Sequence, residues 1–193
     1  GEIEGLTAVL TQTDACDQHQ LADNVAEITA ILKGFDTYGE VTFTTDPDEY
    51  GKYWAIRSGI FPTVGGMRKP GTTCLIEDVA FHIEDLPEAV KDLSELLERH
   101  GYDDSCIYGH ALEGNFHFIV NQSFSTDSEA ARYKAMMEDV VELVVKKYDG
   151  SLKAEHGTGR NMAPYVEYEW GTKAFEVMKR LKKILDPQGI LNP

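Results

Sequence analysis

Two histidines flank a predicted β-hairpin in the segment Tyr-Gly-His-Ala-Leu-Glu-Gly-Asn-Phe-His. His110 ends one predicted strand, and His117 lies at the start of the next, beyond a turn that contains glycine. Because a hairpin places such residues side by side, both imidazoles can reach a single metal ion. Asn115 adds an amide in the same turn. The spacing alone leaves open a second interpretation, in which both histidines are ordinary surface residues.

An acid–imidazole pair follows a later predicted strand, in the segment Lys-Ala-Glu-His-Gly-Thr-Gly-Arg. Glu155 and His156 precede two glycines, so we expect a turn that exposes both side chains at the end of the strand. Two histidines and one carboxylate form a metal-ligand set that leaves coordination positions open. A further imidazole beside the carboxylate can take up a proton at neutral pH. A Glu-His pair alone is common, so this prediction depends on the hairpin lying nearby.

A third candidate is a cationic segment in a chain that is otherwise acidic. Arg57, Arg68 and Lys69 lie within 13 residues of one another. An arginine can bind a carboxylate with two parallel hydrogen bonds, so this segment is a candidate site for an acidic ligand. Solvated surface charge is the alternative. Neither Gly-Thr-Gly-Arg nor Gly65-Gly66 completes a nucleotide-binding glycine motif, and we reject nucleotide binding by them.

Composition excludes several classes of function. The chain has 193 residues, with 18 Lys and Arg against 33 Asp and Glu, which gives a net charge of −15. This charge repels nucleic acids and anionic membrane surfaces, and no apolar run is long enough for a transmembrane segment. Three scattered cysteines encode no iron–sulfur cluster within the chain and favour reduced thiols in a cytoplasm. The chain starts with Gly-Glu-Ile-Glu, without a methionine or a leader, so we expect a piece of a longer protein.

The hydrophobic pattern predicts alternating strands and helices. Expected strands cover residues 6–13, 40–45, 74–83, 105–111, 115–122 and 151–155, and expected helices cover 18–33, 47–60, 87–100, 126–148 and 172–185. Residues 61–73 are expected to form a loop. This order indicates an α+β fold in which helices pack on one face of an antiparallel sheet. No linker interrupts the pattern, so we predict a single domain over residues 1–193.

The motifs resemble those of FAD-linked oxidases of the vanillyl-alcohol oxidase superfamily. The hairpin resembles that family's Gly-His-x-Gly-Asp-Gly-Asn-x-His, and the later segment resembles its Ser-x-x-x-Glu-His-Gly-x-Gly. Near residue 57 the chain reads Trp-Ala-Ile-Arg, similar to the family's Trp-x-x-Arg. The chain ends in Leu-Asp-Pro-Gln-Gly-Ile-Leu-Asn-Pro, similar to the family's Phe-Asp-Pro-x-x-Ile-Leu-Asn-Pro. The four motifs occur in the family's order and span essentially the whole chain.

The resemblance implies the C-terminal, substrate-side domain of a D-lactate, glycolate or D-2-hydroxyglutarate dehydrogenase, with a ferredoxin-like core. It implies a small 2-hydroxy acid as substrate and FAD bound mainly by another domain of the same polypeptide. Similarity to a bacterial subgroup further implies an iron–sulfur region outside this chain. By position, the resemblance implies that His110, His117 and Glu155 bind a zinc- or manganese-like divalent metal and that His156 is the catalytic base. It also implies that Arg57 and Asn115 contact the substrate and that Asn192 contacts the flavin.

The chain departs from the family pattern at several positions. Leu112-Glu113 replaces Gly-Asp in the hairpin, and Phe61 and Ile76 replace a threonine and a lysine of the D-2-hydroxyglutarate enzymes. Lys69, or Arg68 beside it, is the candidate that replaces this lysine. Two other functions stay open: a non-catalytic regulatory module that binds a metal or small acid, and, with weaker support, a metallohydrolase.

Overall fold

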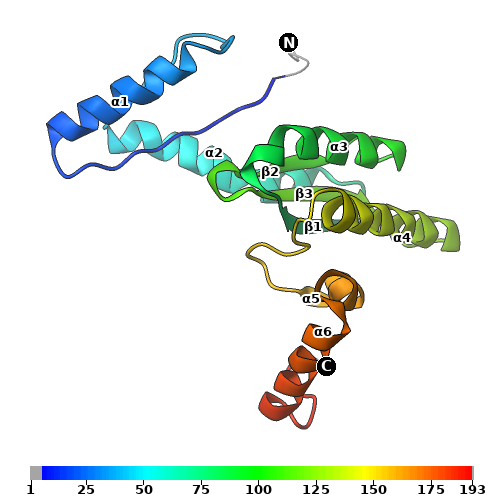
Figure 1. Ribbon diagram of the computed structural model, residues 1–193. Helices are drawn as coiled ribbons and strands as arrows, with labels where there is room; N and C mark the ends of the chain where they lie inside the picture. Colours follow the sequence, from blue (N-terminus) through cyan, green and yellow to red (C-terminus); the bar gives the residue numbers. More distant parts are fainter. Residues whose placement is uncertain (1–5, 193) are drawn as a thin grey trace. The chain divides into compact units, whose positions relative to one another are not determined.

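The computed structural model describes residues 6–192 (Figure 1). The contacts group the chain into two compact units, Gly1–Ile60 and Phe61–Pro193. The single domain predicted from the sequence stays a prediction. Along the described residues, no helix combines the length and the apolar character that crossing a membrane requires.

The first unit contains the helix α1 (Gln18–Leu32) and most of the helix α2 (Pro47–Met67). Asp17 caps α1, since its carboxylate accepts a hydrogen bond of 2.8 Å from the backbone N–H of Gln20. The strands predicted at residues 6–13 and 40–45 are wrong, because both segments lack regular structure. Alternating apolar residues form a strand only where a neighbouring strand supplies hydrogen bonds, and neither segment has such a neighbour within residues 6–192.

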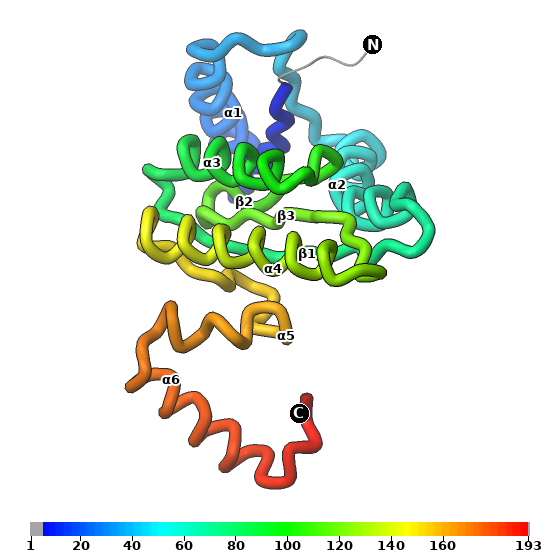
Figure 2. The backbone as a smooth tube through the Cα atoms, turned by 90° about the vertical axis from the view of Figure 1, so that its right-hand side faces the viewer, coloured from blue at the N-terminus to red at the C-terminus, as the bar shows by residue number. Residues whose placement is uncertain are grey.

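The second unit is built on a three-stranded antiparallel sheet. Its strands are β1 (Thr73–Ala80), β2 (Cys106–His110) and β3 (Asn115–Gln122), with β3 in the middle. The helices α3 (Leu86–Arg99) and α4 (Asp127–Val141) lie side by side across one face of this sheet (Figure 2). The predicted α+β fold, with helices on one face of an antiparallel sheet, is therefore confirmed.

The structure has only a single β-bridge where the sequence predicted a strand at residues 151–155. Ser151 pairs with Ala80 in an antiparallel manner at the end of β1, and the residues that follow form bends. The element order is thus that of a β-α-β-β-α-β ferredoxin-like unit whose last strand is almost absent. As a consequence, the segment that carries Glu155 and His156 has no strand ladder to hold it.

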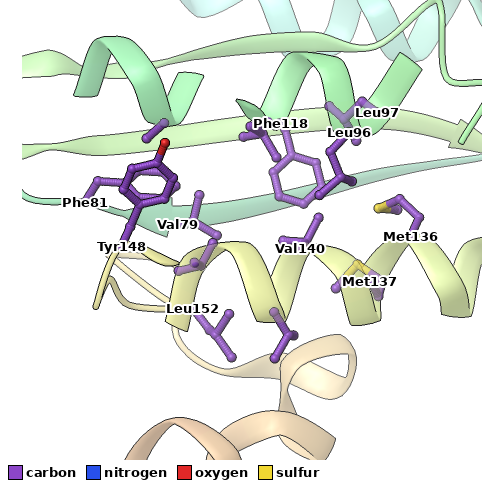
Figure 3. Packing of buried hydrophobic residues seen from close by; sticks show 14 of the residues in the cluster. Val79, Phe81, Leu96, Leu97, Phe118, Met136, Met137, Val140, Tyr148 and Leu152 are labelled. Carbon is purple, nitrogen blue, oxygen red and sulfur yellow. The ribbon is translucent and has the colours of Figure 1, made fainter. Parts of the chain in front are cut away.

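The core lies between the sheet and the two helices (Figure 3). Val79 and Phe118 point from β1 and β3 toward Leu97 of α3 and Val140 of α4, and all four are at most 1% exposed. Burying each such side chain contributes roughly 1.5–3 kcal/mol. Because strand residues alternate between faces, the neighbours of these apolar residues point to the opposite face of the sheet.

The expected loop at residues 61–73 is partly wrong, because α2 continues to Met67 through Pro62. Arg68 follows the helix and donates hydrogen bonds to the carbonyl oxygens of Gly65 and Thr72. Its guanidinium therefore satisfies a carbonyl in the last turn of α2, which the end of a helix leaves without a partner, and also bonds the loop that follows. The loop is thus confined to the few residues between Met67 and β1.

The helices of the C-terminal half agree with the sequence pattern. A capping box at Thr126 starts α4, which continues through a π-helical turn, Glu142–Lys147. The short helix α5 (Gly159–Met162) precedes α6 (Val166–Leu185). Gly171 interrupts α6 with φ 75° and ψ 160°, so the predicted helix over 172–185 begins directly after this break.

Candidate metal and substrate site

Two histidines and one glutamate converge on the sheet face opposite the helices. Nε2 of His117 lies 2.9 Å from Oε1 of Glu155, and Nε2 of His110 lies 3.4 Å from the same oxygen. The ligand atoms of the three side chains lie within 4.8 Å of one another. The predicted meeting of the hairpin with the Glu155 segment is therefore present in the structure.

The β2–β3 hairpin sets the positions of the two histidines. A short 3₁₀ turn, Ala111–Glu113, leads into Gly114, which has a left-handed backbone with φ 66°. A Cβ atom at Gly114 would lie 2.1 Å from the carbonyl oxygen of Phe81, so only glycine fits this turn. The resulting register pairs His110 with Asn115. His117 lies further along β3 and is only 3% exposed.

His156 completes the cluster from the other side. Its ring stacks on that of His117 with centroids 4.6 Å apart and an interplanar angle of 5°. Nε2 of His156 lies 3.9 Å from Oε1 of Glu155, and Nδ1 lies 3.6 Å from Oδ1 of Asp78. The side chain of His156 is 39% exposed, so a ligand can reach this imidazole from solvent.

Asp78 is a site residue that the sequence reasoning missed. It lies on β1 directly opposite His117, and its side chain is fully buried. Burial acts to raise the pKa of Asp78, but hydrogen bonds from the backbone of Glu155 and His156 and the charge of Lys153 outweigh it, so the pKa falls below its ordinary value. The signal available in the sequence was a pair of adjacent acids, Glu77-Asp78, inside an apolar strand.

Burial also keeps His117 neutral. It lowers the pKa of His117, and the neighbouring imidazole of His156 lowers it further, although Glu155 and Asp78 act in the opposite direction. A neutral imidazole is the form that binds a metal. The lowered pKa therefore favours the form of His117 that can bind a metal.

The donor set fits a divalent metal. Neutral imidazole nitrogens and a carboxylate oxygen are the ligands that zinc uses at catalytic sites with open positions. Nδ1 of His117 and Oδ1 of Asn115 are buried, and each lacks a hydrogen-bond partner within the described part of the chain. Such unpaired polar atoms beside the cluster are consistent with a ligand that binds there.

A second possible grouping joins His117 and His156 to Asp78. Three backbone N–H groups and the ammonium of Lys153 already surround the Asp78 carboxylate. Its charge is therefore compensated within the protein, which leaves Glu155 as the better metal ligand.

Three further predicted site residues come from other segments of the chain. Arg57 is half-buried on α2 in the first unit, Lys69 is exposed in the loop before β1, and Asn192 is exposed after α6 with φ 48°. The backbone carbonyl of Lys69 accepts hydrogen bonds from Thr72, which shapes the loop. The substrate and flavin roles of these three residues stay predictions.

The fold and the site together define an α+β unit with a cluster of three imidazoles and one carboxylate on the sheet face opposite α3 and α4. The family model described as FAD linked oxidases, C-terminal domain, matches residues 3–193. The chain therefore belongs to this family.

Curated relatives agree with this assignment. The chain is 28% identical to glycolate oxidase subunit GlcD of Bacillus subtilis over 171 residues, which are 88% of this chain and 35% of the relative. It is 30% identical to mitochondrial D-lactate dehydrogenase [cytochrome] of Arabidopsis thaliana, over 78% of this chain and 26% of the relative. It is also 30% identical to D-2-hydroxyglutarate dehydrogenase of Stutzerimonas stutzeri, over 72% of this chain and 30% of the relative. The chain thus spans about a quarter to a third of these relatives.

Proposed function

We propose that this chain is the substrate-side part of an FAD-dependent dehydrogenase that oxidises a small D-2-hydroxy acid to a 2-oxo acid. The convergence of His110, His117 and Glu155 beside His156 carries this proposal. The family match supports an oxidoreductase, whereas it gives no support to a non-catalytic regulatory module. D-lactate, glycolate and D-2-hydroxyglutarate are the candidate substrates, because the relatives are named for them.

His110, His117 and Glu155 would hold a zinc- or manganese-like divalent metal. When bound, the metal would lower the pKa of the substrate hydroxyl and so ease its deprotonation. Glu155 supplies the negative charge that an all-histidine set would lack. Its side chain is 48% exposed, which leaves room for a substrate at the open coordination positions.

His156 is the proposed catalytic base, which takes the proton of the substrate hydroxyl. Its imidazole is exposed to solvent on one side and packed on His117 on the other, so its orientation is restricted while the substrate can approach. Asn115 offers an unpaired amide oxygen to the substrate. Arg57 and Lys69 are proposed to bind substrate carboxylates, since orientation of the substrate contributes several kcal/mol to the rate.

The remaining chemistry belongs to regions that this chain does not cover. FAD, bound mainly by another domain of the same polypeptide, would accept the hydride from the substrate Cα. Asn192 is proposed to lie near the flavin ring. We further propose a cytoplasmic protein with an iron–sulfur region elsewhere in the polypeptide.

Removal of the metal tests this proposal. The complete polypeptide that carries this chain is assayed by dye reduction with D-lactate, glycolate and D-2-hydroxyglutarate, before and after treatment with a chelator. We expect chelation and the variant Glu155→Gln each to lower the rate at least about tenfold. Added zinc or manganese should restore the chelated wild type, but not the variant.

The matched control is Glu27→Gln, which alters an exposed glutamate on α1. This control should keep the wild-type rate. A rate that neither chelation nor Glu155→Gln changes would contradict the metal site. A wild-type protein that oxidises none of the three acids would contradict the proposed substrate class.

A further inference from the structure

Asp78 receives an unusual concentration of hydrogen bonds for one carboxylate oxygen. Its Oδ2 accepts the consecutive backbone N–H groups of Ala154, Glu155 and His156 at 3.0, 2.6 and 3.2 Å. Consecutive N–H groups that converge in this way form a concave anion-binding site. Here the anion is a side chain from β1, 76 to 78 residues away in the sequence.

The Ser151 hydroxyl bonds the backbone N–H and C=O of Lys153, at 3.3 and 2.9 Å, but no strand ladder holds the residues that donate these bonds to Asp78. Ser151 makes the last bridge to β1, and residues 152–158 form bends and irregular structure. Gly157 and Gly159 follow, both with positive φ, and a Cβ atom at either would meet nothing within 4 Å. The Asp78 carboxylate therefore takes the place of the neighbouring strand that would otherwise hold this segment.

The neighbouring acid, Glu77, contacts only side chains that flank this segment. Its carboxylate accepts hydrogen bonds from the ammonium of Lys153 and, at 2.7 Å, from the side-chain amide of Asn161. These contacts involve side chains on either side of the Glu155–His156 pair. Glu77 is 4% exposed, so both Glu77 and Asp78 are buried. Both also lie on β1 and contact the ammonium of Lys153. Of the two, only Asp78 contacts the backbone that carries the site.

We infer that Asp78 is a positioning residue for the proposed reaction: its carboxylate fixes the backbone of Glu155 and His156 and so aims both side chains at His117. This inference rests on the proposed function only for its catalytic consequence. The hydrogen bonds place Glu155 Oε1 2.9 Å from His117 and hold the His156 ring parallel to that of His117. Loss of these hydrogen bonds would release the backbone and move both Glu155, the proposed metal ligand, and His156, the proposed base, away from the β2–β3 hairpin.

The test compares Asp78→Asn with Glu77→Gln in the complete polypeptide. The Asp78→Asn side chain keeps the shape of the carboxylate but loses its charge, and its amide group would face Lys153. We expect the amides of residues 154–156 to exchange with solvent about 10- to 100-fold faster in Asp78→Asn, because charge-assisted hydrogen bonds are about twice as strong as neutral ones. Zinc affinity, measured by competition with a chelator, should fall about 10- to 100-fold. The turnover number should fall more than KM rises.

Glu77→Gln is the matched control for a merely structural role. It should leave exchange at residues 154–156 and zinc affinity within about threefold of the wild type, even where it lowers overall stability. Equal losses in the two variants, or wild-type exchange and zinc affinity in Asp78→Asn, would overturn the inference.

Hydrogen exchange of the wild type provides a measurement that needs no variant. The amides of residues 154–156 should exchange more slowly than those of the exposed residues 157–159. Equally fast exchange in both sets would overturn the inference even where Asp78→Asn fails to fold. If the wild type oxidises no hydroxy acid, the proposed function fails. The positioning role of Asp78 is still supported in that case if the amides of residues 154–156 exchange slowly in the wild type and fast in Asp78→Asn.

Discussion

His156 and Glu155 are adjacent in the sequence, yet we propose different chemistry for them. The carboxylate of Glu155 points between His110 and His117, while the imidazole of His156 stacks against the outer side of His117. Both side chains can reach the cluster because the segment bends, whereas consecutive residues of a strand would point to opposite faces of the sheet. At the scale of residues, a single peptide bond thus separates the proposed metal ligand from the proposed base.

The role of His156 is testable by removing its imidazole. In the complete polypeptide, His156→Ala should lower turnover by about 10²–10⁴, because the two neighbouring imidazoles are committed to the metal as proposed ligands and cannot replace the base. Zinc affinity should change little, since the proposed ligands remain. FAD should stay bound, as its absorbance spectrum would report.

The control for this variant is His19→Ala, which alters an exposed histidine of α1 that pairs with Asp23. This control should retain the wild-type rate. Turnover of His156→Ala within about threefold of the wild type would remove the assignment of the base.

At the scale of elements, the helices fix one face of the sheet and leave the other face to the site. Asp92 of α3 accepts hydrogen bonds from Lys147 and Tyr148, which follow α4. This contact joins the middle of α3 to the residues that follow α4, beside the edge contact between Phe81 and Tyr148. The helices support the strands that carry Asp78 and His117, so their docking contributes to the geometry of the site.

The Asp92 contact predicts a pH dependence of stability. Hydrogen bonds from Lys147 and Tyr148 hold the pKa of Asp92 below its ordinary value of 3.8. The Asp92 carboxylate therefore binds a proton more readily in the unfolded state than in the folded state. Its contribution to the free energy of unfolding is complete above the pKa of Asp92 in the unfolded state, and it disappears as the pH falls through the pKa in the folded state. Asp92→Asn should lower the free energy of unfolding by about 1 kcal/mol at pH 7.

Urea unfolding of the wild type and Asp92→Asn at several pH values measures this effect. The difference between them should narrow as the pH falls below about 4. Asp103→Asn, which alters an exposed carboxylate in the same unit, serves as the control. A difference that stays constant from pH 7 to acidic pH would show that the charge of Asp92 does not contribute.

At the scale of the whole molecule, the chain covers only part of what the proposed reaction needs. It spans about a quarter to a third of its curated relatives, and its net charge of −15 is unsuited to a general anion-binding surface. The proposed acidic substrate would therefore need local groups to hold it, of which the proposed metal ligands and the cationic side chains are the candidates.

If the metal ligands lie in this chain and the FAD-binding region lies elsewhere, the properties of the 193-residue chain alone can be predicted. Expressed by itself, it should purify without the yellow absorbance of flavin and should reduce no dye with any hydroxy acid. It should still bind zinc, because all proposed ligands lie within it, and His117→Ala should weaken this binding. Flavin that co-purifies with the isolated chain would contradict the proposal that FAD is bound mainly elsewhere.

The sequence by itself determined the α+β class and, within a few residues at their ends, the sheet strands predicted at 74–83, 105–111 and 115–122, and it singled out His110, His117, Glu155 and His156 as candidates. These features are local, because hairpin turns, capping residues and short motifs act over a few neighbouring residues. The same local patterns misassigned residues 6–13 and 40–45, since a strand requires a distant partner that no local pattern reveals.

Only the tertiary structure decided that Asp78 belongs to the site and that Glu155 faces two histidines on another pair of strands. The physical reason is that both depend on long-range contacts. An acid in an apolar strand becomes informative only when the groups that compensate its buried charge are known, and those groups lie some 75 residues further along the chain.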